Sequence, residues 1–147
     1  MKKDIILIIF SSLVGVLLSF FMFKQYDNNE IILTNTNTSK YYFVELGSFS
    51  SYDNMISSNN KLNEYIYSYD NNIYYVYGCI TKNKKNLEKI EGYFKDIEYI
   101  TYIKEFNISN TFLDTKIEEI DKQLETVEDN DSIKKYCKQT LLLYKEG

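Results

Sequence analysis

The sequence predicts an α+β domain with the element order βαββαβ, in which a four-stranded antiparallel sheet carries both helices on one face. The prediction rests on short segments of alternating aromatic and β-branched residues, two segments with apolar residues at helical spacing, and the turn residues Asp70-Asn71-Asn72. An uncharged apolar run precedes this pattern, and a further helical pattern follows it. The 147 residues are therefore expected to form one domain with additional segments before and after it.

The first segment predicts a membrane helix. Ile5–Phe23 contains no charged residue and is long enough, at about 1.5 Å per residue, to cross a hydrocarbon core of roughly 30 Å. Lys2 and Lys3 precede it, so the positive-inside rule places residues 1–4 in the cytoplasm and the rest of the chain outside. A cleaved signal peptide is the alternative, but its apolar region would be shorter, and Phe20–Phe23 lacks a small-residue cleavage site.

Residues 24–40 are expected to form a flexible linker. They contain a run of Thr, Asn and Ser without helical or strand periodicity, interrupted only by Ile31-Ile32-Leu33. The domain that follows would therefore act close to the membrane surface.

The predicted domain covers residues 41–109. Tyr41–Gly47 has the composition of a strand, and Met55, Leu62 and Ile66 then recur at helical spacing. A short strand at 65–69, a hairpin turn and a strand at 73–80 follow. A second helix carries its apolar residues at 87, 90, 94 and 97, and a strand at 100–106 completes the sheet.

Residues 110–147 predict a helical hairpin. Its apolar residues stand at 113, 117, 120, 124 and 127, and then at 133, 137, 141 and 144, so that one apolar stripe runs along both helices. Such a stripe must be buried. We expect it to pack on the two helices of the domain or on a sheet edge, with binding of another protein as the alternative.

The composition excludes several chemistries. The chain has no His and no Arg, which removes imidazole-based catalysis, imidazole zinc ligands and bidentate guanidinium contacts. Beyond the membrane segment, 15 Lys stand against 20 Asp and Glu, a net charge of −5 that disfavours nucleic-acid binding. Cys79 and Cys137 are each expected to be small buried hydrophobes, with a disulfide between them, which an external compartment permits, as the alternative. We expect no catalytic residues, no metal and no cofactor.

One motif resembles a known family. Phe43-Val44-Glu45-Leu46-Gly47-Ser48-Phe49-Ser50, followed by a helix and later by Tyr75-Val76-Tyr77-Gly78, resembles the SPOR domain. That bacterial module binds septal peptidoglycan from which the stem peptides have been removed, and many members carry it outside a single N-terminal membrane segment. Two positions depart from the family pattern: Glu45 stands where Gln is usual, and Met55 where a small residue is common.

Strand parity predicts the binding face. If Val44 and Leu46 point toward the helices, the residues that alternate with them lie on the opposite, open face. Aromatic rings and polar groups on such a face suit sugar rings and hydroxyls. The expected glycan-binding residues are Phe43, Glu45, Ser48, Tyr75, Tyr77, Tyr102 and Lys104.

These observations lead to one functional expectation and one alternative. The chain is expected to be a single-pass membrane protein that binds denuded glycan strands in division or sporulation. The alternative is a membrane-tethered protein-interaction module of a division or sporulation complex, which binds septal or sporulation proteins through its C-terminal helices and does not bind sugar.

Overall fold

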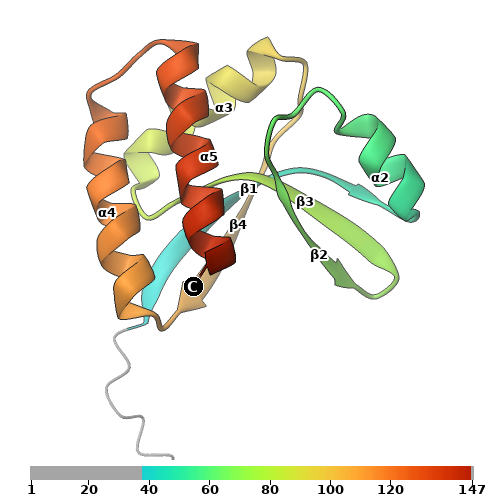
Figure 1. The fold of residues 1–147 in the computed structure, drawn as a ribbon, viewed down its shortest axis with the longest axis horizontal. Coiled ribbons are helices and arrows are strands. Elements are labelled where there is room, and N and C mark those ends of the chain that lie inside the picture. Colours follow the sequence, from blue (N-terminus) through green and yellow to red (C-terminus); the bar gives the residue numbers. More distant parts are fainter. Residues whose placement is uncertain (1–37, 147) are drawn as a thin grey trace, which may run out of the picture. The chain divides into compact units, whose positions relative to one another are not determined.

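The computed structural model describes residues 38–146 (Figure 1). The predicted cytoplasmic N-terminus and membrane segment therefore lie outside the described residues, as does most of the linker. Within 38–146, no helix is both long and apolar enough to cross a bilayer. The elements are β1 (Ser39–Phe49), α2 (Tyr52–Ser58), β2 (Ile66–Asp70), β3 (Ile73–Thr81), the 3₁₀ turn η1 (Lys84–Asn86), α3 (Leu87–Asp96), β4 (Tyr102–Ile108), α4 (Thr111–Glu125) and α5 (Asn130–Glu146).

The predicted α+β fold is confirmed. The four strands lie in the order β2-β3-β1-β4, and each neighbouring pair is antiparallel. Asn71 and Asn72 connect β2 to β3 with φ values of 49° and 63°, the left-handed conformation that tight hairpins require and that asparagine tolerates.

Two predicted boundaries were wrong. The first helix ends at Ser58, because Asn59 turns the chain and its side-chain Nδ2 donates to the carbonyl of Met55 at 2.7 Å. Ile66, which fitted the helical spacing, is the first residue of β2. β1 begins at Ser39, inside the predicted linker, because Ser39 and Lys40 pair with the end of β4.

Both predicted helices of the βαββαβ unit cover the same face of the sheet. Val44, Leu46 and Val76 form one buried cluster with Met55 of α2 and Phe94 of α3, together with other residues of this layer. Met55 is fully buried, so the bulkier side chain at this position is part of the core.

Gly78 allows α3 to approach the sheet closely. A Cβ atom at this position would lie 2.5 Å from Cζ of Phe94 and 2.6 Å from Cδ1 of Leu46. The pairing of β1 with β3 also shifts register here, from Val44 opposite Cys79 to Glu45 opposite Tyr77, so Gly78 is the extra residue of a β-bulge.

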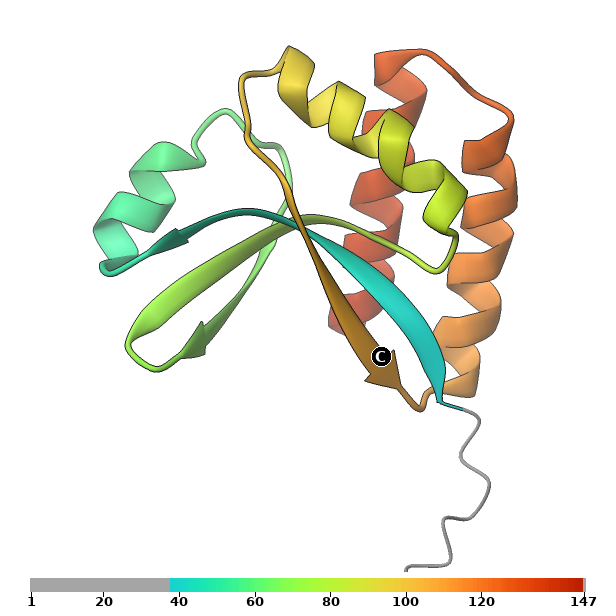
Figure 2. The same ribbon diagram turned by 180° about the vertical axis from the view of Figure 1, so that it is seen from behind.

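The C-terminal hairpin packs on α3 and on an edge of the sheet. β2 pairs with β3 only as far as Tyr77, and α5 lies beside the remainder of β3, where Thr140 Oγ1 accepts a hydrogen bond from the Ile80 amide at 3.2 Å. Figure 2 shows α4 and α5 side by side. This confirms the expectation of packing within the chain. Cys79 and Cys137 are buried, free thiols within this contact, as expected.

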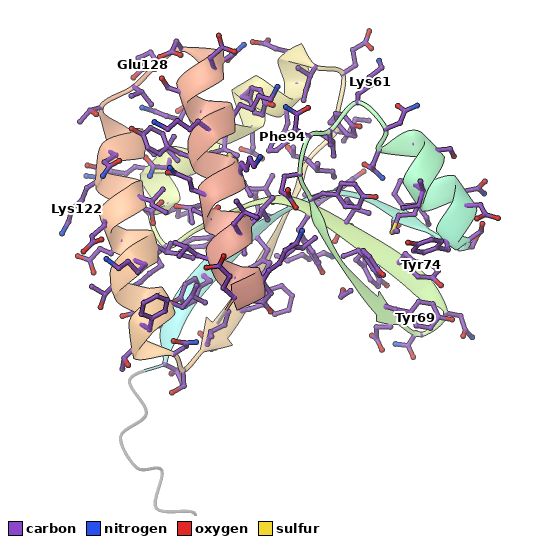
Figure 3. The ribbon with its side chains drawn as sticks, in the orientation of Figure 1. Lys61, Tyr69, Tyr74, Phe94, Lys122 and Glu128 are labelled. Carbon is purple, nitrogen blue, oxygen red and sulfur yellow. The ribbon has the colours of Figure 1, made fainter. Side chains whose placement is uncertain are left out.

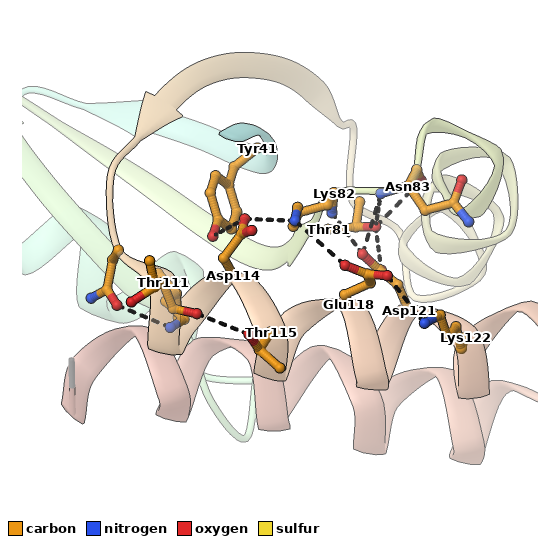
Figure 4. Close-up of polar contacts among 12 residues, drawn as sticks. Tyr41, Thr81, Lys82, Asn83, Thr111, Asp114, Thr115, Glu118, Asp121 and Lys122 are labelled. Carbon is orange, nitrogen blue, oxygen red and sulfur yellow. Dashed lines mark hydrogen bonds and ion pairs between the residues drawn. The ribbon is translucent and has the colours of Figure 1, made fainter. Parts of the chain in front are cut away.

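Polar contacts fasten α4 to the loop between β3 and α3 (Figure 4). Asp121 is 3% exposed; its carboxylate accepts from the Thr81 hydroxyl, from the backbone amides of Lys82 and Asn83, and from Asn86 Nδ2. One turn beyond Asp121, at the C-terminal end of α4, Lys89 Nζ donates to the carbonyls of Leu124 and Glu125 and to that of Val127. A lysine at that place satisfies carbonyls that have no partner within the helix.

The two hydrophobic clusters draw on residues 41–143. The compact unit Asn37–Gly147 therefore has a core of its own and is expected to fold as an isolated fragment.

Candidate functional site

The strand register brings the predicted site residues to the sheet face opposite α2 and α3. Directly paired residues point to the same side of a sheet. Glu45 pairs with Tyr77 and with Tyr102, Phe43 with Lys104, and Ser48 with Tyr75.

The centre of this face is not open, so the sequence-based expectation was wrong there. Phe43 is 3% exposed and Tyr77 is 6% exposed. The ring of Tyr144, in the last turn of α5, lies edge-on to the ring of Phe43, and the two ring centroids are 5.2 Å apart. The ring of Phe106, in β4, also lies edge-on to Phe43, with the ring centroids 4.9 Å apart. The predicted residues at the edges of this face are more exposed than those at its centre. Tyr102 is 57% exposed, Ser48 is exposed and Tyr75 is half-buried.

Glu45 is also buried, and this changes its role. Its Oε2 lies 3.6 Å from Lys104 Nζ and has no hydrogen-bond partner among the described residues. The side chain of Lys104 is 47% exposed. In this arrangement Glu45 anchors Lys104 by charge, and it is the ammonium group that faces solvent.

Beside the covered centre is a cavity of about 700 Å³, which we call the cross-strand groove. It is lined by residues of all four strands, of the loop before β2, of α2 and of the end of α5. The strands are neighbours in the order β4, β1, β3 and β2. Each of them contributes to the lining of the cavity, through Phe106, Phe43, Tyr77 and Ile66 respectively, so the cavity runs across the strands. Seven of its fifteen lining residues are aromatic: Phe43, Tyr52, Tyr65, Tyr67, Tyr77, Phe106 and Tyr144.

The polar part of the groove is almost neutral. Glu64 and Lys145 are its charged lining residues, and they form an ion pair with each other. Asn63, Ser68 and Asn107 provide uncharged donors and acceptors. Burial raises the pKa of Tyr65, and the nearby Tyr52 and Tyr67 raise it further, so this hydroxyl stays protonated at neutral pH.

Of the groove residues, only Phe43 and Tyr77 were predicted from the sequence as site residues, and Phe106 and Tyr144 are among those that were missed. Phe106 follows Tyr102 and Lys104 at the strand period of two, so the same parity could have identified it. Tyr144 was recognised only as a member of the helical stripe; its place above Phe43 depends on how α5 packs, which local periodicity does not reveal.

Among the described residues, no three His, Cys, Asp or Glu side chains are grouped so that they could hold a metal ion. The groove itself offers aromatic planes, amides, hydroxyls and one ion pair, which suits a polar ligand with apolar ring faces.

Searches against family models, curated proteins and solved structures found no match to this chain. The resemblance to the SPOR domain therefore remains an expectation based on the motif at residues 43–50.

Proposed function

We propose that this chain is a membrane-anchored protein that binds denuded peptidoglycan strands in the cross-strand groove during bacterial division or sporulation. The observation that carries the proposal is a cavity of about 700 Å³ that crosses the sheet and is lined mainly by aromatic and uncharged polar residues. Sugars have apolar ring faces and hydroxyl edges, which such a surface complements. The SPOR-like motif and the βαββαβ sheet are consistent with this ligand.

The binding surface in this proposal differs from the one expected from sequence. Phe43 and Tyr77 line the floor of the groove but are almost fully buried, so the rings offered to sugar are those of Phe106 and Tyr144, which are 42% and 40% exposed. The more exposed predicted residues, Ser48, Tyr75, Tyr102 and Lys104, flank it on the same face of the sheet. Glu45 positions Lys104.

The rest of the proposal follows the sequence. Residues 5–23 anchor the protein in the cell membrane with residues 1–4 in the cytoplasm, and the folded unit lies outside, where cell-wall glycan is found. The protein binds without catalysing a reaction and needs no metal or cofactor.

The alternative, a protein-interaction module, relied on a free apolar stripe along the C-terminal hairpin. That stripe is buried in the chain's own core: Leu113, Ile117, Leu124, Cys137 and Leu141 are each at most 2% exposed. No described observation favours this alternative over glycan binding.

Co-sedimentation with peptidoglycan sacculi tests the proposal. The fragment Asn37–Gly147 is expected to pellet with sacculi treated with an amidase, which removes stem peptides, and to pellet less with untreated sacculi. Phe106→Ala removes a groove ring that is 42% exposed, and should reduce retention several-fold. Phe112→Ala is the matched control, because Phe112 is 56% exposed on α4 and does not line the groove.

Two results would overturn the proposal. One is a failure of the unmodified fragment to pellet with amidase-treated sacculi. The other is equal retention of the Phe106→Ala variant and the unmodified fragment. Circular dichroism of each variant checks that it is folded.

A further inference from the structure

Four tyrosine rings gather where α2 meets the β2–β3 hairpin. We call Tyr52, Tyr67, Tyr69 and Tyr74 the tyrosine cluster. Tyr69 and Tyr74 lie side by side at the hairpin in Figure 3, with centroids 4.5 Å apart. The centroid of Tyr52 lies 6.0 Å from that of Tyr67 and 5.8 Å from that of Tyr74.

The cluster exposes much of its aromatic surface. Tyr52 is 46% exposed, Tyr67 is 48% exposed and Tyr69 is 57% exposed. Single exposed aromatic residues are ordinary on protein surfaces, but a contiguous group of them marks a binding surface.

This cluster and the floor of the groove lie on opposite faces of the sheet. On β2, Ile66 pairs with Tyr77 and so faces the groove floor. Tyr67 pairs with Val76, which belongs to the core beneath α2 and α3, and so faces the other way.

The cross-strand groove nevertheless reaches both faces. Its lining includes Ile66 and Ser68 from one face, and Tyr67 and Tyr52 from the other. The cavity therefore passes around the outer edge of β2. β2 is the first strand in the sheet order and pairs only with β3 in the described structure, so its outer backbone amides and carbonyls are available to a ligand.

The chemistry of this path favours a sugar chain over a nucleic acid, which carries a phosphate at every nucleotide. The tyrosine cluster contributes rings and hydroxyls, and the strand edge contributes backbone donors and acceptors. Single-stranded nucleic acids need stacking rings together with a positively charged groove. Lys145, which lines this cavity, is already paired with Glu64.

We propose that the tyrosine cluster is a second sugar-binding platform, and that one glycan strand continues from the cross-strand groove over the edge of β2 onto it. This inference rests on the proposed function and specifies its ligand. A strand that occupies both platforms must be longer than one that fills the groove alone. The protein then selects long glycan strands over short fragments, because only long strands engage both surfaces.

Binding measured against strand length tests this. The probes are amidase-treated glycan strands separated into a tetrasaccharide and a fraction of long strands, titrated into the fragment Asn37–Gly147 by calorimetry. Long strands should bind about ten-fold or more tightly than the tetrasaccharide. The double variant Tyr69→Ala, Tyr74→Ala, at two residues of the cluster that do not line the groove, should lose this preference and keep its affinity for the tetrasaccharide. Tyr69 is 57% exposed and Tyr74 is half-buried, and circular dichroism checks that the domain stays folded.

The outcomes separate this inference from the proposed function. Phe106→Ala should weaken binding of both probes, and Phe112→Ala should weaken neither. If the unmodified fragment binds neither probe, the proposed function fails. If it binds both equally, or if the double variant keeps the preference for long strands, the second platform is disproved while glycan binding stands. Equal weakening of both probes by the double variant also disproves it.

Discussion

The ring of Phe43 in β1 meets the ring of Tyr144 in the last turn of α5, with centroids 5.2 Å apart and planes at 85°. This edge-to-face pair joins the end of the chain to the centre of the sheet face. A double-mutant cycle with Phe43→Leu and Tyr144→Leu should give a coupling energy of about 0.5–1.5 kcal/mol in urea unfolding, typical of such aromatic pairs. Additive effects of the two substitutions would show that the rings do not interact in solution.

Gly78 and Gly92 should respond oppositely to substitution by alanine. At Gly78 a Cβ would overlap Phe94 and Leu46, so Gly78→Ala should lower the free energy of unfolding by about 1–3 kcal/mol. Gly92 is exposed within α3, and a Cβ there would meet no atom within 4 Å. Gly92→Ala should therefore raise stability by about 0.5–1 kcal/mol, through helix propensity. Thermal unfolding of both variants and of the unmodified fragment measures these two effects. A Gly78→Ala variant as stable as the unmodified fragment would contradict the close approach of α3 to the sheet.

Asp121 should be essential for attaching α4. In Asp121→Asn the new amide would replace one of the two oxygens that accept hydrogen bonds from the backbone amides of Lys82 and Asn83 and from side chains. Buried donors left without a partner cost about 1–3 kcal/mol, and we expect a loss of that size in chemical denaturation. Glu118→Gln, at an exposed position on the same helix, is the control and should change stability by less than about 0.5 kcal/mol. Equal effects of the two substitutions would show that the network is not stabilising.

Stability should fall at alkaline pH because of buried tyrosines. Burial raises the pKa of Tyr93 to about 12, and burial together with the neighbouring Asp114 raises the pKa of Tyr41. In the unfolded chain tyrosines ionise near about pH 10, whereas these two stay protonated in the folded chain. The unfolded state therefore loses protons first, and the free energy of unfolding falls as the pH rises from about 10 toward 12.

Tyr93→Phe tests the origin of this fall. Without the Tyr93 hydroxyl, the decrease in unfolding free energy between about pH 8 and about pH 11 should be smaller than in the unmodified fragment. Tyr102→Phe, at an exposed position, should leave the decrease unchanged. The explanation is wrong if the two variants behave alike.

Much of the fold was predictable because local patterns encode it. Alternation in Tyr41–Gly47 and Ile73–Ile80 identified the two central strands, and the asparagines at 71 and 72 identified the hairpin. Apolar spacing identified α3 and both C-terminal helices. The first helix was predicted too long, because Leu62 matches the helical period from Met55 although the helix ends at Ser58; the strand expected at 65–69 is β2.

The candidate site was less predictable, because it depends on contacts between distant residues. Strand parity placed Phe43, Tyr77 and Lys104 on one face, and the register shows them there. Their exposure could not be deduced in the same way. Tyr144 lies far from Phe43 in the sequence, and no local pattern indicates that the two rings meet.

By itself, the sequence determined the secondary structure and which side chains share a sheet face, since both follow from periods of two and of about 3.6 residues along the chain. The tertiary structure alone decided which part of that face is accessible. β2 is shorter than β3, so the last residues of β3 have an edge that β2 does not cover. α5 packs along that edge, and its final turn covers Phe43, leaving a groove at the side where an open sheet was expected.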